Sequence, residues 1–148
     1  AKRVTRRNYI VARGFDLPKH PGAYVLLIDL PRPLELPVVR LGQPTLEPGR
    51  YVYCGSARGP GGLAARVGRH LNRDKSIHWH IDHLTLAGEI LDLDWRTDRS
   101  ECDLRERISA TAGTFVPVAG FGSSDCKQCA SHLLMVSSEF KLSSSLFE

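Results

Sequence analysis

One short segment places an arginine and a histidine four residues apart, so that both side chains could act on one ligand. Residues 63–73, LAARVGRHLNR, have the apolar spacing of a helix whose buried side carries Leu63 and Val67. Arg66 and His70 lie one turn apart beside that side. Arginine offers a forked donor to a phosphate oxygen, and histidine can donate, accept or transfer a proton. The alternative is a solvated helix face whose arginines serve solubility.

Two tyrosines each lie close to a glycine in an apolar run. Residues 22–30, GAYVLLIDL, contain Tyr24, and residues 50–57, RYVYCGSA, contain Tyr53. A buried strand gains most from aliphatic side chains, so a tyrosine there requires a partner for its hydroxyl. We therefore predict two strands and expect each phenol to meet a specific polar partner.

Glu101 lies on the apolar side of a predicted helix at residues 99–110, three positions before Leu104. Burying an unpaired carboxylate is costly, so this position requires an explanation. In one reading Asp98 is the N-cap of the helix and Glu101 completes a capping box. In the other reading Glu101 binds a divalent cation such as Mg²⁺ through its hard oxygen atoms. Glu106 is a second candidate ligand, although it lies off the apolar side.

A cluster of cysteine and histidine near the end of the chain has a spacing that could suit zinc. Cys126, Cys129 and His132 follow one another at intervals of three residues, and Cys102 or His83 could supply a fourth ligand. The usual second C-x₂-C pair is missing. The alternative is that the segment FGSSDC forms a turn with no metal.

The composition is that of an ordinary globular protein with a mildly basic balance. The chain has 148 residues, 42% of them hydrophobic and 24% charged, with a net charge of +4 and a pI of about 9.0. This length suggests one domain, and the charge is compatible with a polyanionic partner. No apolar run is long enough to span a bilayer, and the start lacks the apolar segment of a secretory signal. We expect a soluble cytoplasmic protein.

The remaining pattern predicts a mixed α/β (α+β) domain in which helices pack on a mainly antiparallel sheet. The short connection between the strands predicted at 38–42 and 50–57 favours antiparallel pairing. Further elements are expected in four places: strands at 38–42, 89–95 and 131–138, and a short helix at 76–84. The predicted organisation is a basic N-terminal segment at 1–21, one domain at 22–136, and a C-terminal tail at 137–148.

The order of these elements resembles the GIY-YIG nuclease superfamily. GAY at 22–24 stands where the family has GIY, and YCG at 53–55 stands where it has YIG. The helix with Arg66 and His70 looks like the helix that follows YIG. The similarity extends to the Uri-type endonuclease branch, over roughly residues 20–136, through the segments GPGGLAARVGRHL, HWHIDHL, ECDL and GFGSSDC…SHL.

The resemblance implies a small sandwich around a three-stranded antiparallel sheet, and metal-dependent hydrolysis of DNA phosphodiester bonds. By this resemblance Tyr24 would accept a proton from the attacking water, and Tyr53 and His70 would position water or phosphate. Arg66 would stabilise charge on the phosphate oxygens, and Glu101 would hold one Mg²⁺ or Mn²⁺. Both phenols would then face one pocket.

The sequence departs from the family mainly between the two tyrosines. Tyr24 and Tyr53 are 29 positions apart, which is longer than the usual short hairpin of the family. The additional residues, roughly 31–50, are expected to form an extra hairpin or arm, and the strand near the end of the chain is also additional.

Contacts with the DNA backbone are expected from the arginines Arg58, Arg69 and Arg73. The basic start of the chain could contribute as well, or could be a solvated tail. Trp79 is expected to pack rather than to stack on a base. Two alternatives to a nuclease stay open: a non-catalytic nucleic-acid-binding module of the same fold, and an interaction domain stabilised by zinc.

Overall fold

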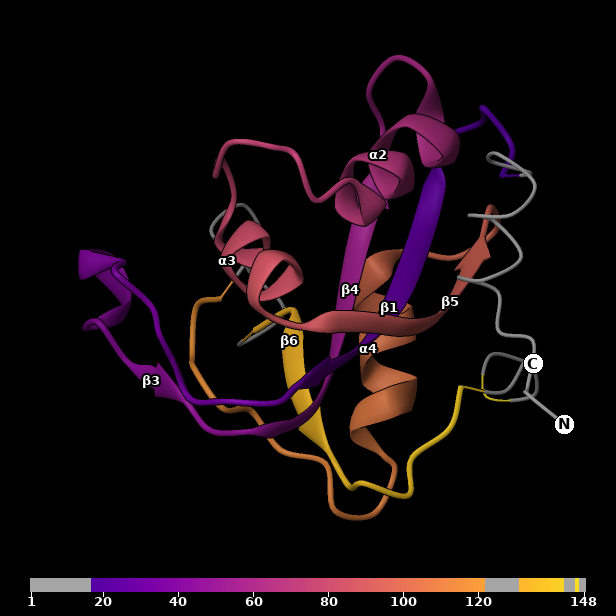
Figure 1. The fold of residues 1–148 in the computed structure, drawn as a ribbon. Coiled ribbons are helices and arrows are strands. Elements are labelled where there is room, and N and C mark those ends of the chain that lie inside the picture. Colours follow the sequence, from indigo (N-terminus) through magenta and orange to yellow (C-terminus); the bar gives the residue numbers. More distant parts are fainter. Residues whose placement is uncertain (1–16, 122–130, 143–145, 147–148) are drawn as a thin grey trace, which may run out of the picture.

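A central antiparallel sheet organises the chain. The computed structural model describes residues 17–121, 131–142 and 146. Strand β1, Gly22–Leu30, lies between β5, Glu89–Arg96, and β4, Gly49–Ala57, and β6, Leu133–Val136, pairs with the outer edge of β4. All four strands are antiparallel to their neighbours (Figure 1). The prediction of a mixed fold with an antiparallel sheet is therefore confirmed.

Alternation along β1 gives the sheet two buried faces. Tyr24 and Leu26 point into one apolar cluster, while Val25 and Leu27 point into another. Helices α2, Gly62–Leu71, and α3, His80–Ala87, cover the first face, and α4, Glu101–Ser109, covers the second (Figure 1). Because β1 is covered on both sides, its sequence is a nearly continuous apolar run rather than an alternating one.

Helix α2 begins at a tight glycine turn that is anchored to the chain before β1. The backbone N–H of Leu63 donates to the carbonyl of His20 at 3.0 Å, and that of Ala64 donates to the carbonyl of Pro18 at 3.0 Å. Gly62 has a φ of 56°, and a β-carbon there would overlap the carbonyls of residues 19 and 20. The glycine turn thus permits a close backbone contact, in which carbonyl groups of the segment before β1 accept hydrogen bonds from N–H groups of the first turn of α2.

The N-terminus of α4 differs from the predicted capping box. The N-cap is Ser100, whose hydroxyl accepts a hydrogen bond from the backbone N–H of Asp103 at 3.1 Å. The prediction that Asp98 caps this helix is wrong, because the helix begins at Glu101, only one residue after Ser100. Glu101 is therefore the first residue of the helix and not the third, whose side chain a capping box would use.

The additional residues between the tyrosines form an arm that projects from the sheet (Figure 1). Strand β2, Leu34–Glu35, pairs with β3, Thr45–Leu46, and the 3₁₀ helix η1, Val39–Leu41, forms the tip. The predicted strand at 38–42 is wrong. Gly42 and Gln43 have φ values of 82° and 49°, so the backbone turns here instead of extending.

Three other boundaries also differ from the predictions. Helix α3 begins at His80 rather than at residue 76, because Asp82 accepts hydrogen bonds from the backbone N–H groups of His78 and Trp79 just before the helix. Strand β6 is shorter than expected, at Leu133–Val136. The expected C-terminal tail contributes Phe140 and Leu142 to the cluster under α4.

Predictions for residues 1–16 and 122–130 lie outside the described residues. No helix in the described ranges is long and apolar enough to cross a membrane.

Candidate functional site

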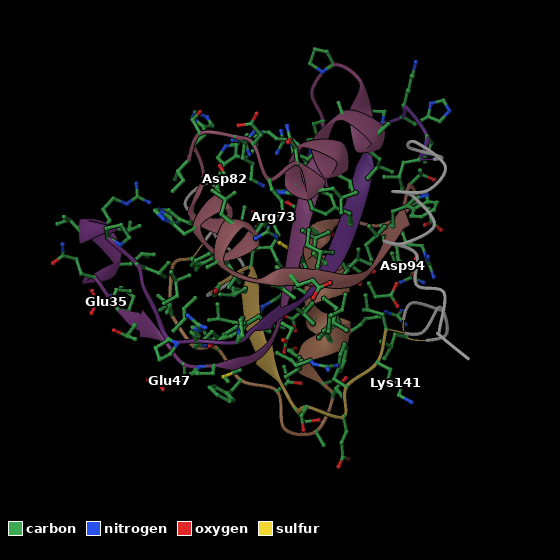
Figure 2. The ribbon with its side chains drawn as sticks, viewed as in Figure 1. Glu35, Glu47, Arg73, Asp82, Asp94 and Lys141 are labelled. Atoms are coloured by element: carbon green, nitrogen blue, oxygen red, sulfur yellow. The ribbon has the colours of Figure 1, made fainter. Side chains whose placement is uncertain are left out.

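A pocket of about 500 Å³ opens where the sheet, all three helices and the arm approach one another. It lies on the face of the sheet that α2 and α3 cover, and Glu101 at the N-terminus of α4 reaches its wall. Its lining comprises Tyr24, Arg40, Tyr53, Gly55, Ser56, Arg58, Arg66, His70, His78, Trp79, His80, Ile81, Glu101 and His132. Figure 2 shows the side chains on the complete ribbon. The pocket is rich in cationic and ring side chains, and Glu101 is the single carboxylate among the described residues that line it.

The structure brings together all five residues that were predicted to be catalytic. Tyr24, Tyr53, Arg66, His70 and Glu101 line the same pocket. Arg58 and His132 also line it, whereas Cys126 and Cys129 lie outside the described residues. Arg69 and Arg73 do not belong to the lining.

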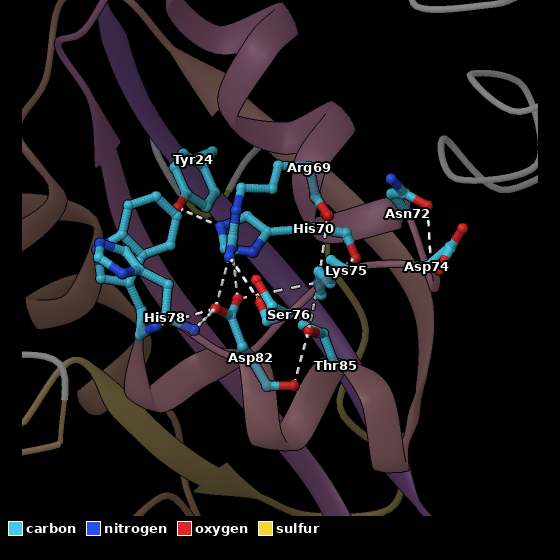
Figure 3. Close-up of polar contacts among 11 residues, drawn as sticks. Tyr24, Arg69, His70, Asn72, Asp74, Lys75, Ser76, His78, Asp82 and Thr85 are labelled. Atoms are coloured by element: carbon cyan, nitrogen blue, oxygen red, sulfur yellow. Dashed lines mark hydrogen bonds and ion pairs between the residues drawn. The ribbon is translucent and has the colours of Figure 1, made fainter.

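Tyr24 and His70 form the central polar contact of the pocket. The hydroxyl of Tyr24 lies 2.6 Å from Nε2 of His70 in a buried hydrogen bond (Figure 3). The ring centroids of Tyr53 and His70 are 6.1 Å apart, close to an edge-on arrangement. Nδ1 of His70 is buried without a hydrogen-bond partner among the described residues. A proton can therefore move between phenol and imidazole without crossing solvent.

Gly55 explains why a tyrosine and a glycine occur together at this position. Gly55 on β4 is paired with Tyr24 on β1. A β-carbon on Gly55 would overlap the ring and hydroxyl of Tyr24, so the phenol lies directly across the missing side chain. Gly22 permits a second close approach, because a β-carbon there would lie 2.7 Å from the carbonyl oxygen of Arg96.

Burial keeps the central groups uncharged at neutral pH. Burial raises the pKa of Tyr24 well above its usual value, and Tyr53 adds to this shift while Arg66 opposes it. Burial likewise raises the pKa of Tyr53 to about 12. Burial, together with the positive charge of Lys75 as a smaller cause, lowers the pKa of His70 to about 3. The resting pair is thus a neutral phenol and a neutral imidazole.

Trp79 holds two of the helix arginines in place. The guanidinium carbons of Arg66 and Arg69 each lie 4.3 Å from a ring centroid of Trp79. Trp79 therefore packs against cations, in agreement with the expected packing role. Arg66 also lines the pocket, whereas Arg69 does not.

Arg69 is committed to an ion pair that connects α2 to α3. Its two terminal nitrogens donate to the two carboxylate oxygens of Asp82 at 2.6 and 2.8 Å (Figure 3). Although burial opposes the charge of Asp82, hydrogen bonds from Arg69 and from two backbone N–H groups hold the pKa of this carboxyl well below its usual range. This pair gives Arg69 a structural role.

Arg73 is similarly occupied at the far end of the helix pair. Its guanidinium donates to the carbonyls of Leu86 and Gly88 at 2.8 and 3.1 Å, at the C-terminus of α3. Lys75 donates to the last carbonyls of α2 and to Thr85. The predicted DNA contacts of Arg69 and Arg73 would have to coexist with these bonds.

The choice between the two candidate glutamates follows from their places on α4. Glu101 lines the pocket with a side chain only 16% exposed, and Oε2 lies 3.9 Å from Arg58. Glu106 is 64% exposed and forms its ion pair with Arg105 at 2.7 Å. Glu101 is therefore the carboxylate that could hold a cation in this pocket.

Sequence reasoning missed the contribution of the arm. Arg40 lies in η1 at the tip of the arm and lines the pocket. Its only sequence signal was a basic residue within the additional segment, which does not specify a direction for the arm. His80 also lines the pocket, and burial together with Arg40 lowers its pKa.

Comparison with known proteins assigns this chain to a family. The profile of a domain of unknown function, DUF123, matches residues 23–148, which include every lining residue. The chain belongs to the DUF123 family. Comparisons with curated proteins and with solved structures found no match.

The pocket of this DUF123 chain combines three chemical capabilities. Arg40, Arg58 and Arg66 can bind an anion with several oxygens, such as a phosphodiester. Tyr24 and His70 can transfer a proton. Glu101 can hold a divalent cation beside both. Together these groups suit hydrolysis or transfer at a phosphate.

Proposed function

We propose that this chain is a metal-dependent DNA endonuclease with a GIY-YIG-type site of the Uri-type branch. The observation that carries the proposal is the convergence of Tyr24, Tyr53, Arg66, His70 and Glu101 on one pocket. These residues come from two strands and two helices, and the first and the last, Tyr24 and Glu101, are 101 − 24 = 77 positions apart. A purely structural role would not require an arginine, a carboxylate and a phenol–imidazole pair to share one opening.

The residues present fit a hard divalent cation at Glu101. The carboxylate lines the pocket, and its contact with the highly exposed Arg58 is long, at 3.9 Å. Mg²⁺ typically binds proteins through one or two carboxylates and completes its shell with water and substrate oxygens. A cation held there, Mg²⁺ or Mn²⁺, would polarise the phosphate and ease departure of the leaving oxygen.

Tyr24 and His70 would remove the proton from the attacking water. As the water oxygen forms its bond to phosphorus, the water proton passes to the Tyr24 oxygen, and the phenol proton passes to Nε2 of His70, 2.6 Å away. The bond from phosphorus to the leaving oxygen breaks, and that oxygen takes a proton from solvent. Because burial disfavours both a free phenolate at Tyr24 and a lasting imidazolium at His70, both protons would move together and the extra proton would then leave His70 for solvent through the open pocket.

The arginines would bind the substrate and its developing charge. Arg66 would donate to the non-bridging oxygens of the scissile phosphate, with its guanidinium oriented by Trp79. Arg40 and Arg58 would contact neighbouring phosphates along the strand. Phosphate contacts of this kind position DNA without reading its sequence.

The test is cleavage of labelled single-stranded, duplex and branched DNA by the purified chain, with and without Mg²⁺ or Mn²⁺. We expect metal-dependent cleavage of at least one substrate and a loss of about 100-fold or more in Arg66→Ala, as for other preorganised donors. Lys141→Ala is the matched control, because it removes one exposed positive charge from outside the pocket lining.

Two outcomes would contradict the proposal. Cleavage that is equal in Arg66→Ala and in the unmodified chain would mean that the pocket is not the active site. Salt-sensitive DNA binding without cleavage of any substrate would instead support a non-catalytic nucleic-acid-binding module.

A further inference from the structure

A second group of metal-ligating side chains lies beside the proposed catalytic pocket. Glu101 and Cys102, in the first turn of α4, face His132, the residue immediately before β6. One ligand atom from each of the three residues lies within 4.8 Å of the other two. Sγ of Cys102 is 3.9 Å from Nε2 of His132. Glu101 and His132 also line the pocket.

The backbone fixes both halves of this group. His132 is 6% exposed, its N–H donates to the carbonyl of Phe121 at 2.9 Å, and its carbonyl accepts from Cys54 on β4 at 3.0 Å. The first turn of α4 is fixed by the Ser100 cap. The three side chains are therefore presented from two segments that are bonded into the sheet or capped, which lowers the cost of assembling a site.

The donor set is chemically distinct from that of a magnesium site. A thiolate and an imidazole favour a borderline or soft cation, whereas Mg²⁺ is bound almost entirely by oxygen. We propose that Glu101, Cys102 and His132 form a three-ligand site for Zn²⁺ on the wall of the pocket. Zinc–ligand bonds of roughly 2.0–2.3 Å in a tetrahedron separate ligand atoms by roughly 3.3–3.8 Å, so these side chains need to close by no more than about 1.5 Å.

Among the described residues three side chains supply ligands, which leaves the fourth position of a tetrahedral site without a described ligand. Zinc sites whose fourth position stays open bind water or substrate rather than only stabilise a fold. Because Glu101 and His132 line the pocket, a phosphate or water in the pocket can reach that position. Zinc would compete with Mg²⁺ for Glu101. The inference does not depend on nuclease activity, since it concerns metal binding alone.

This site differs from the zinc cluster that the sequence suggested. Only His132 is common to both sets, and Cys102 appeared there as one option for a fourth ligand. Cys126 and Cys129 lie outside the described residues and are not part of the proposed site. Variants of these two cysteines therefore provide a matched control for Cys102.

The test measures metal binding directly, with no DNA present. The purified chain, residues 1–148, is stripped of metal and titrated with Zn²⁺, and separately with Co²⁺, whose bond to a thiolate gives a charge-transfer absorption band. We expect one Zn²⁺ per chain and a cobalt–thiolate band. Cys102→Ala should abolish the band and weaken zinc binding by at least about 100-fold. Loss of a residue that only hydrogen-bonds to a metal ligand already costs up to about 100-fold in affinity, so loss of a ligand should cost at least as much.

The double variant Cys126→Ser/Cys129→Ser should keep both the band and the zinc. His132→Gln should weaken zinc while its circular dichroism remains unchanged, which separates ligand loss from unfolding. The proposal is overturned if the unmodified chain shows no cobalt–thiolate band, or if the double variant loses the band. It is equally overturned if Cys102→Ala, folded as judged by circular dichroism, binds zinc as tightly as the unmodified chain.

Discussion

Tyr24 and His70 form a buried pair in which each group is neutral at rest. The hydrogen bond between them is 2.6 Å long, and burial raises the pKa of the phenol while it lowers the pKa of the imidazole. The Tyr24 hydroxyl is the atom through which the proposed reaction would remove a proton. Its role can therefore be separated from its packing by a change of one atom.

Tyr24→Phe should reduce DNA cleavage by about 100-fold or more while the protein stays folded. The lost hydrogen bond should lower the free energy of unfolding by about 1–3 kcal/mol, because Nε2 of His70 stays buried without its partner. Tyr51→Phe is the matched control. It removes a hydroxyl from a buried tyrosine whose partner is the carbonyl of Glu47, outside the pocket lining, so cleavage should be unchanged. Equal activity in the two variants would contradict the role of Tyr24.

The low pKa of His70 predicts acid sensitivity of the fold. Above a pH of about 6.5 this histidine is neutral in both the folded and the unfolded chain. As pH falls from about 6.5 toward 3, the unfolded chain binds a proton that the folded chain excludes, so stability falls. Between pH 7 and pH 5 the contribution of His70 should be about 2 kcal/mol.

Urea unfolding at several pH values measures this effect. The loss of stability between pH 7 and pH 5 should be smaller in His70→Gln than in the unmodified chain. His80, whose pKa is also lowered by burial, should remain as a smaller contributor in both proteins. Parallel pH profiles for the two proteins would contradict the buried neutral state of His70.

At the scale of the elements, the pairing of β1 with β4 places Gly55 opposite Tyr24, and the missing side chain of the glycine leaves space for the phenol ring. Gly55→Ala should displace the ring of Tyr24, because the new methyl group would overlap it. Cleavage should fall to the level of Tyr24→Phe or below, and stability should also fall because the ring is packed at 1% exposure. Gly59→Ala is the control, since a β-carbon there meets nothing within 4 Å. Comparison of cleavage and melting temperature for both variants tests the register argument.

The arm is the element that sets this chain apart from a short hairpin between the tyrosines. Its tip brings Arg40 to the pocket, and we expect it to hold one phosphate of the DNA. Arg40→Ala should weaken DNA binding similarly for all sequences and should reduce the slope of log affinity against log salt by about 0.9. Arg32→Ala, which alters an exposed arginine outside the pocket lining, should change binding less. An unchanged salt slope in Arg40→Ala would exclude the phosphate contact.

At the scale of the whole molecule, sequence reasoning predicted the sheet and its helices because their periodicity is strong. The apolar run of β1 and the spacing of Leu63 and Val67 on α2 specify buried faces that any fold must cover. The predicted strand at 38–42 failed because apolar residues also occur at a tight turn. The capping prediction at Asp98 failed because the helix begins at Glu101, so that Ser100, the residue immediately before it, is the N-cap.

Sequence reasoning singled out several of the residues that line the pocket, but it did not predict the full extent of the lining. Residue types and spacing identified Arg66, His70 and Glu101, and the structure places all three in one pocket. Spacing could not reveal that Arg69 is bound by Asp82, because that contact depends on how α3 docks against α2. Nor could it reveal Arg40, because the direction of the arm depends on tertiary packing.

The measurement that tests the central claim most directly is Mg²⁺-dependent DNA cleavage by Glu101→Gln and by Glu106→Gln. Both variants remove one negative charge from α4, but only Glu101 lines the pocket. We predict that Glu101→Gln loses about 100-fold or more of the cleavage rate and that Glu106→Gln retains it. If the two variants cleave equally, or if Glu106→Gln is the inactive one, the assignment of this pocket as a metal-dependent nuclease site is contradicted.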